Sequence, residues 1–360
     1  MGVRHSKDWL MTPGAITVMG ERNSVRPSNW KRAALGGAGI ALGGVFLWLA
    51  MRNIDPAVVA STLQQVNVHW LAMAITIYLT SMGLRGIRWG VLLRATDEVK
   101  WRHAAEGSLT GFAANYVLPG RLGELFRADY ARRVFNMSRF ASLGTIVVER
   151  VCDGIVLVCA LWGSLVWLLL TGFALTQTLW VMIVGATASG LFGIALAFIL
   201  IAQRIDLRGF GIPEVLAKRW DHLVRGISSV LRGNTATVVF CSIGLWALEA
   251  LALGVLVRSL GVSLSPPENL MLLGLAALST VVPTAPGYLG TYQLVYGHVF
   301  QMFGYSQTIG IIAATTVQVF CFGTVTILGG LVLLSRSSLT IWRAHRMGRP
   351  EIQKIASRHQ

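Results

Sequence analysis

Apolar residues run along this chain in long stretches separated by short polar connections. Six stretches are long enough, or nearly so, for a helix to cross a hydrocarbon core, which takes about 20 residues. They are residues 33–50, 70–93, 151–170, 179–202, 238–260 and 309–334. The pattern predicts six membrane-spanning helices. The first is expected to be an uncleaved anchor, because residues 1–30 lack the apolar core of a signal peptide.

Two further apolar stretches are too short to span and end in the same kind of interruption. One ends at Pro119-Gly120 and the other at Pro283-Thr-Ala-Pro-Gly287. Exposed backbone polar groups cannot lie in lipid, so such breaks persist only where they are buried in protein or line a cavity. A matching pair of interrupted segments points to a transport site in a membrane protein built from repeats.

Composition and charge placement support a membrane protein and set its topology. Hydrophobic residues make up 54% of the chain and charged residues 13%, against about 25% charged in soluble proteins. The Lys and Arg residues cluster, with six in 1–32, eight in 94–142, six in 204–237 and six in 336–360. Because cytoplasmic connections carry the Lys/Arg excess, both termini and the two basic connections are predicted to face the cytoplasm. Charge placed beside the membrane argues against nucleic acid as a partner.

This topology decides how the interrupted segments insert. If residues 103–118 crossed the membrane, every later connection would change sides and the basic stretch 204–237 would be exported. Re-entrant elements avoid this, with 103–140 entering from the cytoplasm and 268–304 from the outer side. The two halves, 33–171 and 179–336, then repeat one order of elements in opposite orientation, which is the pattern of an inverted repeat.

The predicted fold is therefore an all-α polytopic membrane protein with six full spans and two re-entrant helical elements. A cytoplasmic N-terminal tail (1–32) precedes the membrane domain (33–336), and a cytoplasmic C-terminal tail (337–360) follows it. Residues 54–66 and 215–231 are amphipathic and form either helices in the membrane interface or ordinary linker helices. The four cysteines lie in apolar runs without metal-ligand spacing, so no metal site is predicted.

Ionisable residues inside apolar segments are costly and mark functional candidates. Arg85 and Arg88 share one helical face, which suits a phosphate as well as it suits simple anchoring at the membrane surface. Arg121, Glu124 and Arg127 follow the first break, beside Asn115, near a helix start that favours anions. The other interpretation of this group is a solvated run of charges.

A second set of charges lies in later spans. Glu149, Arg150 and Asp153 open one span, and we expect them to form buried ion pairs with each other and with Arg121 or Arg127. Glu249 has no neighbouring cation in the sequence. It either pairs across helices or stays protonated, and this makes it the candidate proton site.

The second break is rich in residues that interrupt regular backbone hydrogen bonding and in residues with hydrogen-bonding side chains. Its prolines and glycines remove donors and allow a tight backbone, and Thr284, Thr291, Tyr292 and Gln293 supply uncharged hydrogen-bonding groups. The chain has no phosphate-binding loop, nucleotide fingerprint, nucleophile elbow or His-rich metal spacing. No catalytic residue, cofactor or metal is predicted, and the chain is expected not to be an enzyme.

These segments resemble the membrane domain of the lysylphosphatidylglycerol synthases, also called flippase-like integral membrane proteins. The resemblance covers residues 33–336 and is carried, in this order, by segments 85–93, 115–127, 148–153 and 283–290. It implies a stand-alone member that lacks the aminoacyl-transferase domain, because about 25 residues follow the last span. One departure is Gln293, where many relatives have an acidic residue.

The resemblance implies that a lipid moves between leaflets, with the polar residues of the breaks near its headgroup. The predicted path comprises Arg85, Arg88, Asn115, Arg121, Glu124, Arg127, Pro283, Thr284, Pro286, Gly287, Tyr288, Gly290 and Gln293. The lipid is an anionic phospholipid, a glycolipid or a hopanoid. The alternatives are an integral-membrane transferase for a lipid-linked substrate, using Glu124, Glu149 and Asp153, or a non-transporting partner of a lipid-modifying synthase. A homo-oligomer is left open, and the expected location is the bacterial cytoplasmic (inner) membrane.

Overall fold

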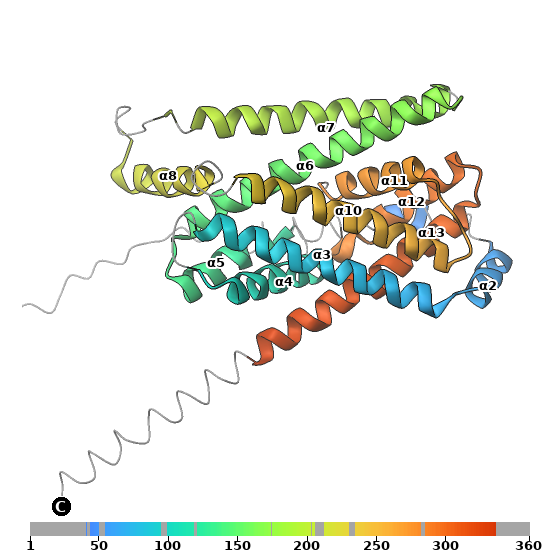
Figure 1. Cartoon of the computed structure of the whole chain (residues 1–360), viewed down its shortest axis with the longest axis horizontal. Coiled ribbons are helices and arrows are strands. Elements are labelled where there is room, and N and C mark those ends of the chain that lie inside the picture. The colour runs from blue at the N-terminus through green and yellow to red at the C-terminus, as the bar shows by residue number, and fades with distance from the viewer. Residues whose placement is uncertain are drawn as a thin grey trace, which may run out of the picture.

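The structure is a computed structural model that describes residues 55–335, together with residues 41 and 44–49. Residues 95–98, 119–120, 174, 203, 206–211, 230–234 and 282–284 lie outside the description. Every regular element within the described ranges is a helix (Figure 1). The helices are α2 (Pro56–Gln64), α3 (Val68–Arg94), α4 (Trp101–Val117), α5 (Gly123–Phe135), α6 (Arg139–Leu170), α7 (Leu175–Ala202), α8 (Glu214–Ile227), α10 (Thr235–Ser259), α11 (Pro266–Ser279), η3 (Pro286–Tyr288), α12 (Thr291–Met302), α13 (Gln307–Thr316) and η4 (Val317–Phe322).

Among the residues that the structure describes, five helices are long and apolar enough to cross a membrane, which confirms the all-α polytopic fold. They are Val68–Arg94, Arg139–Leu170, Trp180–Ala202, Thr235–Ser259 and Gln307–Ser335, and each corresponds to a predicted span. The predicted first span, 33–50, lies mostly outside the described residues, although residues 41 and 44–49 are helical. The last span is continuous, but its middle turns, η4, form a π-helix.

Both interrupted segments form pairs of short helices. α4 packs against α5, and α11 packs against α12, with a break between the members of each pair. At a rise of 1.5 Å per residue, the 17 residues of α4 span about 26 Å, short of the hydrocarbon core. The helix interruptions therefore lie where the sequence predicted them. Entry and exit on one side of the membrane, and the inverted repeat, stay predictions.

Local signals explain why helices begin and end where they do. Ser265 caps α11, and Glu268 accepts a hydrogen bond from its backbone N–H at 2.7 Å, which forms a capping box ahead of a proline. α12 ends just before Gly304, whose φ of +82° suits the left-handed turn that terminates many helices.

α3 and α10 form the centre of the molecule and make its most extensive helix contact. α6 crosses both, α4 covers one part of α3 with α5 packed on α4 and α6, and α7 lies at the periphery (Figure 1). Close approach depends on small residues. For example, a Cβ on Gly226 of α8 would lie 2.0 Å from the carbonyl oxygen of Ala141 in α6.

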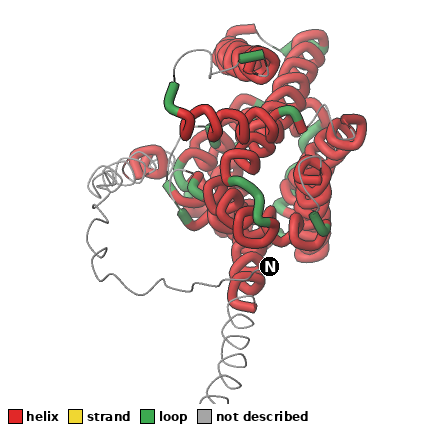
Figure 2. The backbone as a smooth tube through the Cα atoms, turned by 90° about the vertical axis from the view of Figure 1, so that its left-hand side faces the viewer, coloured by secondary structure: helices red, strands yellow, loops and turns green. Residues whose placement is uncertain are grey.

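The connections separate by charge to the two ends of the molecule. The basic regions around α5 and α8 lie at one end, which faces the viewer in Figure 2. The connections with few basic residues meet at the other end, where the Asn67 N–H donates to the Ser259 carbonyl at 2.9 Å and the Tyr305 hydroxyl donates to the Ser263 carbonyl at 3.1 Å. The helix arrangement thus agrees with the charge pattern on which the topology was predicted.

Candidate functional site

Three long helices each carry polar side chains along one face. The spacing is three or four residues, so the side chains of each set point the same way from an α-helix. These residues are Ser81, Arg85 and Arg88 on α3, Glu149 and Asp153 on α6, and Ser242, Trp246 and Glu249 on α10. All three faces meet, and α5 contributes Arg127 and Glu124. We call the charged members of this group, together with Arg150, the ion network.

Arg88 lies at the centre of the ion network and is fully buried. Its Nη1 lies 2.6 Å from Asp153 Oδ1 and 2.9 Å from Ser242 Oγ, and its Nη2 lies 3.1 Å from Asp153 Oδ2. A weaker contact of 3.4 Å joins Nη2 to Glu149 Oε1. Trp246 also donates its indole N–H to Asp153 at 3.0 Å. The carboxylate of Asp153 is thus held by several donors from different helices.

Arg85 lies on the same face, one turn before Arg88 along α3, and pairs mainly with Glu249. Its Nη2 and Nε lie 2.6 and 3.1 Å from Glu249 Oε1, and Ser81 donates to the same oxygen at 3.2 Å. The guanidinium also lies over the rings of Phe112 and Trp246. Of the two alternatives that the sequence left for Glu249, pairing across helices is the arrangement observed. A proton role for it stays a prediction.

The third part of the ion network joins α5 to α6. Arg127 donates to Glu149 Oε2 at 2.6 Å, and its guanidinium carbon lies 4.3 Å from the centroid of the Trp89 ring. Glu149 therefore pairs with one of the two arginines that the sequence suggested. Arg150 lies nearer the surface, 3.4 Å from Asp153 and 3.9 Å from Glu124.

The ion network contains equal numbers of positive and negative groups. Arg85, Arg88, Arg127 and Arg150 face Glu124, Glu149, Asp153 and Glu249, so its formal charge is zero. Removing one member of a buried pair costs about 3–5 kcal/mol, because its partner stays buried and uncompensated. The arrangement holds four helices together. Since Arg85, Arg88 and Arg127 are already bound to carboxylates, they are poorly placed to take up a lipid phosphate.

The first break is held by two side chains from its own surroundings. Asn115 accepts a hydrogen bond from the Gly123 N–H at 2.8 Å, which links the end of α4 to the first residue of α5. Arg121 has a φ of +56°, a left-handed conformation that costs a non-glycine residue about 1–2 kcal/mol. Its Nη2 donates to the hydroxyl of Thr280, which directly follows α11.

The second break lies against the first. Tyr288, also at positive φ, packs edge-on against Tyr116 of α4 with 6.4 Å between ring centroids. A Cβ on Gly287 would lie 3.4 Å from the Tyr116 carbonyl oxygen. We define the break junction as Tyr116, Arg121, Thr280, Gly287 and Tyr288. The two interruptions, about 165 residues apart in the sequence, are thus neighbours in space.

The π-helix η4 connects both sides of the break junction. Phe322 stacks face to face on Tyr116, with centroids 4.2 Å apart. Gln318 donates to the Gly287 carbonyl at 2.9 Å and accepts from Gln293 at 2.6 Å. Gln293 in turn accepts from the Gly290 N–H at 2.8 Å. π-helical turns occur often at functional sites, and this one places an amide and a ring on the two breaks.

The predicted path residues therefore fall into three groups. Arg85, Arg88, Glu124 and Arg127 belong to the ion network. Asn115, Arg121, Pro286, Gly287, Tyr288, Gly290 and Gln293 lie at or beside the break junction. Pro283 and Thr284 lie outside the described residues.

Sequence reasoning missed several residues that complete these groups, among them Ser81, Tyr116, Ser242, Trp246, Thr280, Gln318 and Phe322. For α3 and α10 a signal was present, because Ser81 and Ser242 each lie seven residues before a charged residue on the same helical face. For Gln318 and Phe322 no local signal was available, since an α-helical spacing does not reveal a π-helix.

Fold and site together define a helical multi-pass membrane protein with a neutral ion network and two adjoining helix breaks. Residues 37–329 match the family described as the lysylphosphatidylglycerol synthase TM region. The chain belongs to this family, which confirms the resemblance drawn from its motifs.

A similar protein is the glycosyltransferase AglD of Haloferax volcanii. It is 28% identical over an alignment of 351 residues, and the match covers 86% of this chain and 55% of that protein. The chain thus spans just over half the length of this relative. No solved structure matches the chain. Family and relative indicate a function connected with membrane lipids.

The relative corrects one prediction. The chain lacks the catalytic motifs of known soluble enzymes, and the sequence therefore predicts that it is not an enzyme. Similarity to a protein named as a glycosyltransferase contradicts that expectation. The physical reason for the error is that the absence of motifs known from soluble enzymes does not exclude catalysis.

Proposed function

We propose that this protein moves a membrane lipid between leaflets, and that the lipid headgroup passes the break junction. The observation that supports the proposal is the meeting of two interrupted helix pairs from different halves of the chain. Irregular backbone at membrane depth is tolerated where it is enclosed by protein or lines a cavity, and transporters bind their substrates at such places.

The chemistry of the break junction suits an anionic phospholipid headgroup. Arg121 has no carboxylate partner among the described residues, in contrast to the arginines of the ion network. Its fork of donors matches the oxygens of a phosphodiester. The hydroxyls of Tyr78 and Tyr116, which lie 2.7 Å apart, and the amides of Gln293 and Gln318 add uncharged hydrogen-bonding groups.

The ion network has a different role in this proposal. Because each of its carboxylates already has a cationic partner, the ion network has a structural role and holds the helices beside the breaks in place. Arg85, Arg88 and Arg127 are therefore left out of the proposed headgroup path. Glu124 and Arg150 are each about 28% exposed at the side chain and form its accessible edge.

A vesicle assay tests the proposal. The full chain is reconstituted into liposomes with fluorescent phosphatidylglycerol, and exchange between leaflets is followed by quenching from outside. We expect exchange at least about tenfold faster than in protein-free liposomes, a difference of about 1.4 kcal/mol in the barrier. Gly287→Leu should slow it towards the protein-free rate, because the side chain would fill the space beside the Tyr116 carbonyl.

The matched control is Gly163→Leu on α6, where an added Cβ meets nothing within 4 Å. This variant should exchange lipid at the wild-type rate. Protein that folds correctly but leaves exchange at the protein-free rate would refute the proposed function.

A second candidate function, transfer of a sugar to or from a membrane lipid, is favoured by the similarity to the glycosyltransferase. Glu124 would be the carboxylate best placed to meet a soluble donor, because it is partly exposed and only loosely paired with Arg150. Formation of a glycosylated lipid from a nucleotide sugar, lost in Glu124→Gln while lipid exchange persists, would establish it. Absence of product with intact exchange would leave translocation as the function.

A further inference from the structure

We propose that the break junction opens sideways into the bilayer and binds a phospholipid whose acyl chains stay outside the protein. The inference rests on the proposed function, and it assigns a surface to the acyl chains in addition to the groups that meet the phosphate. The ligand is therefore an anionic phosphodiester that carries acyl chains, and the same phosphodiester without chains is not a ligand.

Exposed apolar side chains flank both helix breaks. We call these side chains the junction rim, and each of them is between 39% and 56% exposed. The junction rim consists of Val117, Leu118, Leu122 and Leu125 at the first break, and of Val281 and Leu289 at the second. Exposed apolar residues that gather around a polar group suit an amphipathic ligand.

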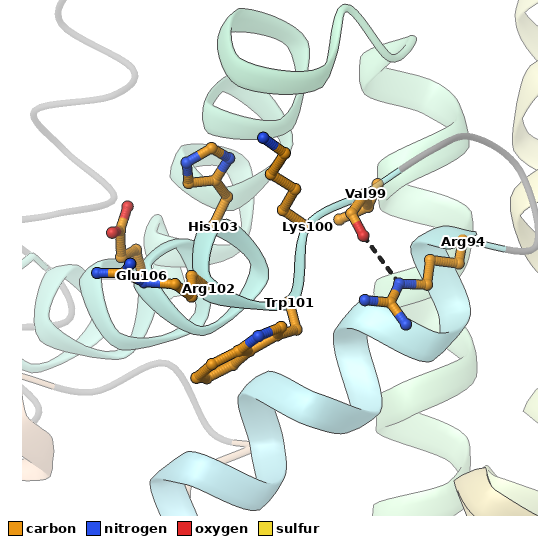
Figure 3. Close-up of a pocket in the computed structure, with 7 residues that line it drawn as sticks. All are labelled: Arg94, Val99, Lys100, Trp101, Arg102, His103 and Glu106. Atoms are coloured by element: carbon orange, nitrogen blue, oxygen red, sulfur yellow. Dashed lines mark hydrogen bonds between the residues drawn. The ribbon is translucent and has the colours of Figure 1, made fainter.

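The depth of the first break follows from the path of α4 along α3. α4 begins after the connection in which Arg94 Nε donates to the Val99 carbonyl at 2.8 Å, at the end of α3 (Figure 3). α4 then runs back beside α3 until the hydroxyls of Tyr116 and Tyr78 lie 2.7 Å apart. Within the 27 residues of α3, Tyr78 lies about 15 Å from the first residue and about 24 Å from the last. The break after Tyr116 therefore lies beside the interior of a candidate membrane span.

Arg121 carries its charge at this depth without a carboxylate partner among the described residues. Its Nη2 donates to the Thr280 hydroxyl, and its buried Nε has no hydrogen-bond partner. The nearest carboxylate along the chain, Glu124, lies 3.9 Å from Arg150 instead. The undescribed residues of the two breaks, 119–120 and 282–284, contain no ionisable side chain. A charge at membrane depth is costly without a counter-ion, and neither break supplies one.

A phospholipid matches both features of this surface. The guanidinium fork of Arg121 suits two oxygens of a phosphodiester, and the junction rim suits acyl chains that remain in the bilayer. A soluble phosphate would match Arg121 alone. Since the junction rim draws on both breaks, the bound lipid would contact both halves of the chain.

Photo-crosslinking tests where the acyl chains lie. The full chain is reconstituted into liposomes that contain phosphatidylglycerol with a diazirine in one acyl chain, and mass spectrometry of the digested protein locates the adducts. We expect more adducts on the junction rim than at Ile194 of α7, which is 71% exposed and reports contact with bulk lipid. Arg121→Gln should lower the yield on the rim at least about tenfold, because a hydrogen bond to a charged group is lost. A diacylglycerol probe with the same diazirine, which lacks the phosphate, should give the same low yield.

Two variants control for structural effects. Arg132→Gln removes an arginine from the last turn of α5 and should leave the yield unchanged. Thr280→Val removes the hydroxyl that Arg121 contacts but keeps the charge, so its yield should equal or exceed that of wild type. A loss in Thr280→Val as large as that in Arg121→Gln would assign the effect to contact between the breaks and overturn the proposal.

A competition experiment separates the lipid from a soluble anion. Glycerophosphoglycerol, which is the headgroup without its chains, should leave the yield on the junction rim unchanged at about hundredfold excess over the probe. Displacement of the probe, or a yield on the rim no higher than at Ile194, would overturn the proposal. Lipid exchange between leaflets without adducts on the rim would refute this inference and leave the proposed function in place. Adducts on the rim without lipid exchange would do the reverse.

Discussion

At the scale of single residues, the charged side chains buried in the interior neutralise one another. Arg85 and Glu249 are both largely buried, and each would be costly to leave alone. Phe112 and Trp246 lie against the Arg85 guanidinium, and this further shields the pair from water. Such pairs contribute little net stability compared with apolar residues, but they penalise any arrangement that separates the partners.

A double-mutant cycle on Arg85 and Glu249 tests whether the two buried side chains are energetically coupled. Arg85→Met and Glu249→Met should each lower the free energy of unfolding by about 3–5 kcal/mol, and the double variant should lose less than the sum of the two, because no charge is left unpaired. Unfolding in detergent gives the values. The same cycle on the exposed pair Lys218 and Glu214 should show coupling of about 0–1 kcal/mol. Additive losses at Arg85 and Glu249 would contradict the buried pairing.

At the scale of elements, the two interrupted helix pairs depend on close backbone contact. α4 and α5 approach each other at Gly111 and Gly123, where a Cβ on Gly123 would lie 2.0 Å from the Gly111 carbonyl oxygen and 2.5 Å from Asn115 Oδ1. Small residues permit this distance in membrane proteins, where packing rather than hydrophobic burial drives helix association. The contact also holds Asn115 where it caps α5.

Gly123→Ala should therefore destabilise the protein by about 1–3 kcal/mol through overpacking, and it should slow lipid exchange because the first break is displaced. Gly163→Ala on α6 has open space around the new methyl group and should stabilise by roughly 0.5–1 kcal/mol. Thermal unfolding measures the stability of both variants against wild type. A Gly123→Ala protein as stable as wild type would mean that α4 and α5 are not in this contact.

At the scale of the whole molecule, the ends differ in charge and the helix pairs join at the breaks. The connection between α2 and α3 meets the last residue of α10 at the end with few basic residues, where the Asn67 N–H donates to the Ser259 carbonyl. α5 and α8 occupy the basic end (Figure 2). Positive charge at one end predicts that this end faces the cytoplasm.

Cysteine labelling tests this orientation and the predicted re-entry of α4 and α5. In a variant without the four native cysteines, an impermeant maleimide added to intact cells should label Gln65→Cys and Ser263→Cys. It should label Lys100→Cys and Asn136→Cys only after permeabilisation, since the charge pattern predicts that both ends of this helix pair face the cytoplasm. Labelling of Lys100→Cys and Asn136→Cys from opposite sides would show that the pair crosses the membrane.

Much of the fold followed from the sequence because its causes are local. Span lengths, the interruptions at Pro119 and Pro283 and the clustering of basic residues depend on neighbouring residues alone. The candidate residues were also found in this way, because ionisable groups in apolar segments stand out. Their division between the ion network and the break junction was not predictable. Arg85 and Glu249 are 164 positions apart, and nothing in the sequence pairs them.

The sequence by itself thus determined that the chain is a multi-pass membrane protein with two broken helices, since hydrocarbon thickness and backbone hydrogen bonding impose those features on any such chain. The tertiary structure decided which charges cancel, because pairing depends on which helix faces meet. It also brought the two breaks together beside the π-helix of the last span. That contact leaves Arg121, among the arginines beside the breaks, without a carboxylate partner in the described structure.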